Sequence, residues 1–128
     1  MNPNISKDVY ESLAEFRYQL KRFLHFSDSE ARKFGITPQQ HQLLLAIKGF
    51  PSREFATPGE LSERLLITHH ACVGLIDRSE HLGLVSRRKN PEDGRSVLVE
   101  VTEKGSDILE KLSEIHLEEL TRIGLFKG

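Results

Sequence analysis

The 128-residue sequence predicts an α+β fold that is mainly α-helical. The first observation is a pair of helix-start signals within residues 57–83, the pattern of two helices joined by a tight turn. The second is a pair of strand-like segments separated by turn-forming residues, which indicates a β-hairpin. The third is an amphipathic helical pattern at each end of the chain. Together they predict one domain with a modest core.

Composition limits the class of protein. With 38% hydrophobic and 29% charged residues, the chain has the composition of a soluble globular domain. The amino terminus is polar and the longest apolar run, 43–47, is too short to span a bilayer, so we expect neither a signal peptide nor a transmembrane helix. The single cysteine cannot form a disulfide within the chain and fits a reducing cytoplasm.

The net charge of −1 hides a segregated charge distribution. Residues 87–95 include four basic and two acidic side chains, whereas residues 100–120 include seven acidic side chains and two lysines. Such a separation is expected when one face of a domain meets phosphate groups and another face does not.

A long first helix is predicted to begin at Ser6 or Asp8, since either side chain can cap it. A narrow stripe of the kind that packs against another helix follows, at Val9, Leu13, Phe16, Leu20 and Phe23. The sequence S-x-x-E at 27–30 has the form of a second capping box, so the helix is expected to break there and restart. Gly35 is expected to end the second piece.

The next helix is predicted from Thr37, with Gln40 completing its capping box, through Ile47 to a stop at Gly49. Residues 52–57 are long enough for a single small strand.

Two helices then follow each other closely. Thr57 and Glu60 form a capping box for the first, and Thr68 caps the second, which should end at Gly83. Residues 68–82 are therefore predicted to be a DNA recognition helix. At 100° per residue its core side carries Cys72, Leu75, Ile76, Ser79 and Leu82. Its outer side carries His70, Val73, Gly74, Asp77 and His81.

The hairpin and the last helix complete the chain. Residues 84–88 and 96–101 are strand-like, and the residues between them are rich in turn formers, which predicts a hairpin with a basic, exposed tip. Thr102 is expected to cap a helix whose apolar stripe is Ile108, Leu112, Ile115, Leu120 and Ile123.

This order of elements is that of a winged helix-turn-helix with a flanking helix at each end. We expect a single domain over 1–128, with the winged helix at about 36–101 and dimerisation helices at about 6–34 and 102–124. The terminal stripes support a homodimer, because they would favour aggregation unless they were buried against a partner.

The motifs resemble those of the MarR family of bacterial transcriptional regulators. The similarity covers roughly residues 36–105 and includes ITPQQHQLLLAI and TPGELSERLLIT. Its most specific part is the wing, with D-x-R at 93–95, an alternating strand and T-x-x-G at 102–105. The resemblance implies a homodimer with interlocked terminal helices and two winged helices on a pseudo-palindromic operator. Many relatives are repressors released by small aromatic or phenolic compounds, and some sense oxidants through cysteine.

Candidate DNA contacts come from the recognition helix and the wing. Arg95 is expected to enter the minor groove, and the resemblance gives Asp93 the role of orienting either this arginine or the hairpin. His70 is a candidate donor to a base edge and Val73 a candidate contact for a thymine methyl group, with an ordinary solvated helix face as the alternative. The remaining candidates are Thr68, His69, Gly74, Arg78, Arg87, Arg88 and Lys89. The last three are expected to bind phosphates, with solvated strand-end charges as the alternative, and for Arg78 a phosphate contact and a structural role stay open.

Three side chains raise further questions. Gly74 lies inside a helix, where it costs ~1 kcal/mol relative to alanine, and a close approach to the DNA backbone would explain it. The family position of Asp77 implies a salt bridge to an arginine of the same lobe. Cys72 falls on the core side of its helix, where a buried thiol is common, so redox sensing is the less favoured interpretation.

The resemblance also implies a pocket for a small aromatic effector, with candidate residues Phe16, Phe23, His41 and Leu45. A metal site is not expected, because adjacent histidines on a helix diverge by about 100°, although His41 or His116 could contribute to one through tertiary contacts. No nucleophile, base and metal ligand converge in the sequence, so we predict no enzyme activity and no cofactor. The alternative function is a protein-interaction module, favoured by Gly74, by Gly94 in place of a family arginine, and by the slightly acidic charge.

Overall fold

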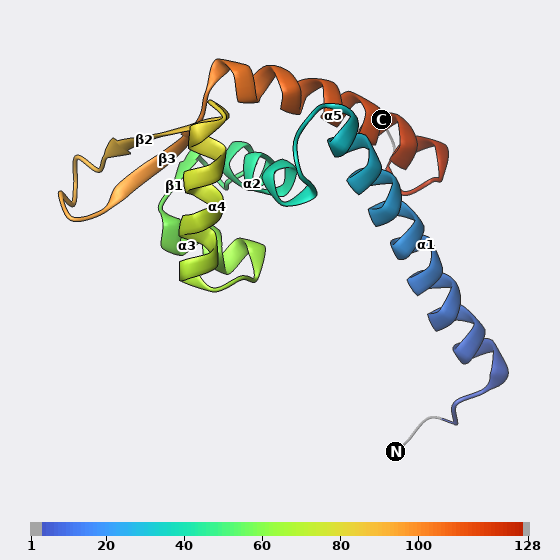
Figure 1. The fold of residues 1–128 in the computed structure, drawn as a ribbon. Coiled ribbons are helices and arrows are strands. Elements are labelled where there is room, and N and C mark those ends of the chain that lie inside the picture. The colour runs from blue at the N-terminus through green and yellow to red at the C-terminus, as the bar shows by residue number, and fades with distance from the viewer. Residues whose placement is uncertain (1–3, 127–128) are drawn as a thin grey trace.

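A computed structural model describes residues 4–126 as a winged-helix lobe joined to two long terminal helices (Figure 1). The elements in chain order are α1 (Lys7–Lys33), α2 (Pro38–Lys48), β1 (Phe55–Ala56), α3 (Pro58–Leu65), α4 (His69–His81), β2 (Val85–Lys89), β3 (Val97–Val101) and α5 (Glu103–Arg122). The small sheet and α2, α3 and α4 form the lobe, α5 leads away from it, and α1 meets α5 and extends outward (Figure 1). The predicted fold class is confirmed.

The three strands form one antiparallel sheet in the order β1-β3-β2. In the hairpin, Val85 pairs with Val101 and Lys89 with Val97, so the wing is the loop between β2 and β3. The two-residue strand β1 adds to the other edge of β3, with Ala56 opposite Val99. The predicted hairpin and the small strand before the helix-turn-helix are both confirmed.

The predicted helix starts in the winged helix and at α5 are confirmed. At each of these four helix starts, the hydroxyl of the N-cap threonine accepts a hydrogen bond from the backbone N–H three residues later. The N-cap threonines are Thr37, Thr57, Thr68 and Thr102. Gln40 and Glu60 return a side-chain bond to the cap backbone, which completes the two predicted capping boxes. Gly83 has φ +76°, the left-handed conformation expected just after a helix.

The predicted break at 27–30 is wrong, because α1 is continuous to Lys33. The polar side chains that suggested a capping box are used in other contacts. The Ser27 hydroxyl lies 2.8 Å from Nε2 of His116 on α5, and Glu30 forms an ion pair with Lys33 at 2.7 Å. Ser27 therefore joins two helices instead of starting one.

The core lies inside the lobe and continues along the first half of α5. Its largest fully buried side chains include Leu43, Leu44, Ile47, Leu61, Ile76, Leu84, Val99 and Leu112. The first turn of α5 packs so closely on the start of β2 that a Cβ at Gly105 would overlap the carbonyl oxygen of Leu84. The Thr102 hydroxyl closes this corner, accepting from the Gly105 N–H at 3.1 Å and donating to the Gly83 carbonyl at 2.5 Å.

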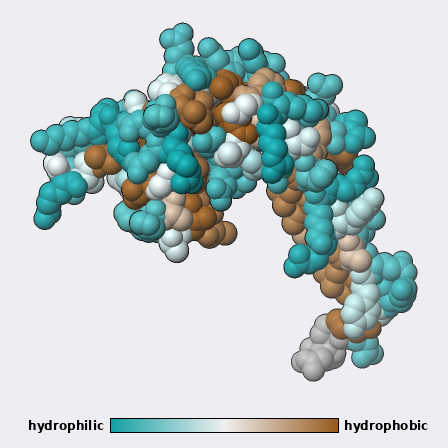
Figure 2. Space-filling model, in the orientation of Figure 1, coloured by the Kyte–Doolittle hydropathy of each residue, from teal (hydrophilic) through white to brown (hydrophobic). Residues whose placement is uncertain are grey.

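The outer part of α1 is different, because its apolar stripe is exposed. Leu13 is 60% exposed and Phe16 is 67% exposed, and Ala31 alone is buried among the residues of α1. Figure 2 shows this apolar band along the projecting helix. In the described range, 4–126, no helix is long and apolar enough to cross a membrane.

Candidate nucleic-acid interface

The helix α4 is held against the lobe by the face that the sequence predicts. Cys72, Leu75, Ile76 and Ser79 are all buried. The expectation for Leu82 is wrong, since this side chain is 43% exposed. Leu82 is the C-cap residue, so the chain has already left the helical path on which the prediction was based.

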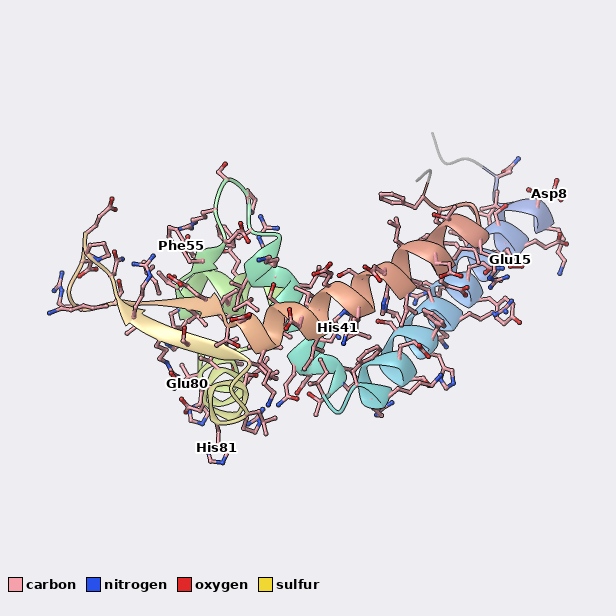
Figure 3. The ribbon with its side chains drawn as sticks, turned by 90° about the horizontal axis from the view of Figure 1, so that it is seen from above. Asp8, Glu15, His41, Phe55, Glu80 and His81 are labelled. Carbon is pink, nitrogen blue, oxygen red and sulfur yellow. The ribbon has the colours of Figure 1, made fainter. Side chains whose placement is uncertain are left out.

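The opposite face of α4 is open. His69, His70, Arg78 and His81 are exposed, whereas Val73 and Gly74 are half-buried. Figure 3 looks nearly along α4 and shows His81 directed away from the lobe, with Glu80 on the side of β2. The outer face of α4 is therefore polar, and His69 and His70 lie at its amino-terminal end.

The guanidinium of Arg87 on β2 holds two carboxylates of α4. Its Nη2 lies 2.5 Å from Asp77 Oδ1, and its Nη1 lies 2.6 Å from Glu80 Oε1. Burial opposes the charged form, but the bonds to Asp77 and Glu80 raise the pKa of Arg87 above its ordinary value. The predicted salt bridge of Asp77 to an arginine of the same lobe is thus present in the structure. Glu80 was missed in the sequence, although it lies three residues after Asp77 on the same side of a helix.

The other basic residues of β2 lie along the hairpin. Arg88 lies opposite Leu98 of β3 and forms an ion pair with Glu100, two residues further along that strand. The Arg88 guanidinium also lies 5.3 Å from the centre of the Phe55 ring. Lys89 runs across the loop, so that its Cε lies 3.3 Å from the position of a Cβ on Gly94. In this conformation Arg87 and Arg88 are engaged in ion pairs, and their predicted phosphate contacts stay a prediction.

The wing tip carries the most exposed cation of this region. The side chain of Arg95 is 96% exposed. Asp93 accepts a hydrogen bond from the Arg95 N–H at 3.0 Å, and its carboxylate lies 3.6 Å from Arg95 Nε. A shallow hollow lies between the wing, the start of α3 and the start of α4, lined by residues that include Gly59, His69 and Arg95. The fold thus places His69 and Arg95, 26 positions apart in the sequence, around one surface hollow.

The four predicted effector residues do not form one pocket within the described chain. Phe23 and His41 converge on His116, with ring centres 5.9 Å and 4.9 Å from that of His116. Phe16 lies seven positions before Phe23 on exposed helix, about 10 Å along the axis, and Leu45 is 51% exposed. His116 and Phe26, whose rings are 5.5 Å apart, were missed because nothing in the sequence shows where α5 crosses α1.

His41 and His116 form the polar centre of this cluster. The Leu112 carbonyl can only accept, so His116 donates to it from Nδ1 at 2.6 Å, and Nε2 of the same ring lies 2.8 Å from the Ser27 hydroxyl. Burial, aided by the nearby His116 and opposed by Asp28, lowers the pKa of His41 to about 4. Within residues 4–126 no three His, Cys, Asp or Glu side chains are grouped so that they could hold a metal ion. Burial raises the pKa of the Cys72 thiol, which is fully covered by the core.

Comparisons with known proteins agree with this architecture. The sequence model described as MarR family matches residues 34–96, from just before α2 to the wing. The organic hydroperoxide resistance transcriptional regulator of Bacillus subtilis is 31% identical over 107 residues, which cover 84% of this chain and 66% of that protein. The chain spans between 41% and 66% of the length of the curated relatives it matches.

Two solved structures show the same fold. A MarR family protein from Bacillus stearothermophilus superposes with a TM-score of 0.80 at 24% identity, over 94% of this chain and 82% of that one. A cysteine-to-serine mutant of MarR from E. coli, solved with operator DNA, gives a TM-score of 0.71 at 23% identity, over 94% of this chain and 84% of that one.

Proposed function

Because the chain belongs to the MarR family of transcriptional regulators, we propose that it is a homodimeric regulator that binds double-stranded DNA in a sequence-specific manner. The observation that carries the proposal is the shared edge of α4 and the wing, where His69 and the exposed Arg95 border one hollow. In this arrangement the outer face of α4 would lie in the major groove, and the wing arginine would enter the adjacent minor groove. The similarity of the fold to a MarR structure solved with operator DNA supports DNA binding by this chain.

The pairing of charges supports the assignment of this edge. Asp77 and Glu80 repel phosphates, but the single guanidinium of Arg87, which bonds to both, offsets one of their two negative charges. Arg78 on α4, and Lys89 and Arg95 on the wing, are exposed and supply positive charge at this edge. The acidic residues of α5 lie on another side of the molecule, so the net charge of −1 does not oppose binding at this edge.

The exposed stripe of α1 supports the homodimer. A second copy packing on Leu13 and Phe16 would bury two of the large apolar side chains that α1 exposes. A two-fold axis between the copies would present two α4 helices to successive major grooves, with half-sites of a pseudo-palindromic operator about 10 bp apart. In this proposal the protein acts in the cytoplasm as a repressor, and a small aromatic effector binds near Phe23 and His41.

The test is the binding of genomic DNA fragments by wild type and by Arg95→Ala. We expect wild type to retain a defined set of fragments, with log affinity falling as log salt rises at about 0.9 per phosphate contact. Arg95→Ala should lose about tenfold or more in affinity, because a groove contact and a charge are both removed. Lys111→Ala on the exposed side of α5 is the matched control and should bind like wild type.

Two outcomes would contradict the proposal. If wild type retained no fragment at low salt, the protein-interaction module would be the better function. If Arg95→Ala and Lys111→Ala bound equally well, the wing would not lie in the interface.

A further inference from the structure

The outer face of α4 carries one line of residues, His70, Gly74 and Arg78, each four positions after the last. Residues at this spacing stack along one side of a helix, so a side chain at position 74 would stand between the other two. Glycine weakens a helix interior relative to alanine, and its presence here needs a reason.

The side chain of Arg78 supplies that reason. The nearest atom that a Cβ on Gly74 would meet is Nη1 of Arg78, at 3.3 Å. Arg78 therefore runs back along α4 toward the amino terminus, the direction in which helical side chains lean. Its guanidinium lies over the bare backbone of Gly74, at the middle of the helix and not at its end.

The neighbouring charges leave this guanidinium free. Asp77 and Glu80 flank Arg78 in the sequence, but both carboxylates bond to Arg87 on β2. Arg78 itself is exposed and takes part in no ion pair within the described residues. Both acids are thus engaged with β2, and neither pairs with Arg78.

We propose that Gly74 and Arg78 form one base-reading unit, in which the missing side chain lets the Arg78 guanidinium lie flat on α4 and donate to O6 and N7 of a guanine in the major groove. This inference rests on the proposed function and names Arg78 as the residue that recognises a base in the major groove. The planar guanidinium matches the two guanine acceptors, and a lysine ammonium does not. Gly74 serves the placement of an arginine and not a close approach of the DNA backbone.

The experiment selects bound sequences from a randomised DNA duplex library with the full chain. Wild type should enrich a motif with a guanine at one position of each half-site. Arg78→Ala should lose that preference and bind the wild-type motif about tenfold to a hundredfold more weakly, while the other positions keep theirs. Arg78→Lys should not restore the preference.

Variants at Gly74 test the geometry without removing the arginine. Gly74→Leu fills the space that the guanidinium occupies, so it should lose the same guanine preference while its melting temperature does not fall. Gly74→Ala places a Cβ 3.3 Å from Nη1 of Arg78, which must shift by a few tenths of an ångström, so it should weaken the preference less than Gly74→Leu does. Gly74→Leu also decides the matter if Arg78→Ala does not fold.

The outcomes distinguish a failure of this inference from a failure of the proposed DNA-binding function. If wild type enriches no motif and binds no duplex, the proposed function fails, and the base-reading unit fails with it. If wild type enriches a motif that Arg78→Ala and Gly74→Leu also enrich, DNA binding stands and the base-reading unit is wrong. A drop of about one in the salt slope of Arg78→Ala, with an unchanged motif, would then make Arg78 a phosphate contact.

Discussion

The winged-helix lobe and the outer part of α1 bury their apolar side chains to opposite extents. In the lobe, Leu43, Leu44 and Ile47 of one short helix are completely buried. In the first four turns of α1, Leu13 and Phe16 are more than half exposed, on a helix more than twice as long as α2. Figure 1 shows the same contrast in the ribbon, where the helices and strands of the lobe lie against one another and α1 projects away from them.

The contrast teaches that the two regions depend on different partners for their stability. The lobe is completed by contacts within one chain, such as the Thr102 hydroxyl that joins Gly83 to Gly105. Among residues 4–126, no hydrogen bond joins the outer part of α1 to another element. A lone amphipathic helix gains little stability from its own backbone bonds. Changes inside the lobe should therefore act on folding, whereas changes on the stripe of α1 should act on assembly.

The largest effect is expected where the lobe is packed most tightly. Gly105→Ala places a Cβ on the carbonyl oxygen of Leu84, so the first turn of α5 must move away from β2. We expect a loss of about 3 kcal/mol or more in the free energy of unfolding, measured by urea denaturation at fixed protein concentration.

Gly59→Ala is the control of opposite sign. A Cβ there would meet nothing closer than the Thr57 hydroxyl at 3.9 Å, in the first turn of α3. Alanine should leave stability unchanged or raise it by up to about 1 kcal/mol. If Gly105→Ala were as stable as Gly59→Ala, the tight corner between α5 and β2 would not limit the stability of the lobe.

The second effect concerns the stripe of α1. The double variant Leu13→Asp/Phe16→Asp puts charges into the proposed dimer interface and should weaken dimerisation by roughly a hundredfold or more. Sedimentation should detect the shift toward monomer, and hydrogen exchange should show loss of protection in α1 while the buried amides of α2 stay protected. Ala14→Asp adds a charge off the stripe and should leave the dimer intact. A dimeric double variant would mean that another surface joins the two copies.

The same contrast explains how much could be predicted from the sequence. The lobe was predictable because its helix starts are local: Thr37, Thr57 and Thr68 each cap a helix through a residue three positions later. The roles of Ser27 and Glu30 were not, because a hydroxyl that bonds to His116, 89 positions away, looks like a cap when only its neighbours in sequence are known.

The interface was predictable in part for the same reason. Asp93 and Arg95 bond within one turn, and a local motif reveals them. The ion pairs that take Arg87 and Arg88 out of the set of free cations depend on the register of two strands and on the position of α4. The contact between Arg78 and Gly74 depends on a rotamer, which the spacing of residues permits but does not specify.

The smallest effect is expected at the junction of the two regions, where the ring of His41 on α2 packs against that of His116 on α5, near the charge of Asp28 on α1. The pKa of His41 is about 4 in the folded chain against an ordinary value of 6.5, so the unfolded chain binds more protons between these two values. Stability that comes from the neutral imidazole is therefore complete above pH 6.5 and is lost as the pH falls toward 4.

Urea unfolding between pH 7.5 and 4.5, at constant ionic strength and protein concentration, should show this loss, with about 2 kcal/mol removed by His41 at the acid end. His41→Gln removes the titrating group and should flatten the dependence over this range. His70→Gln, on the exposed face of α4, should leave the wild-type dependence in place. If His41→Gln and wild type lost stability in parallel, the acid sensitivity would arise elsewhere, and the junction would not couple protonation to the contact between the lobe and the terminal helices.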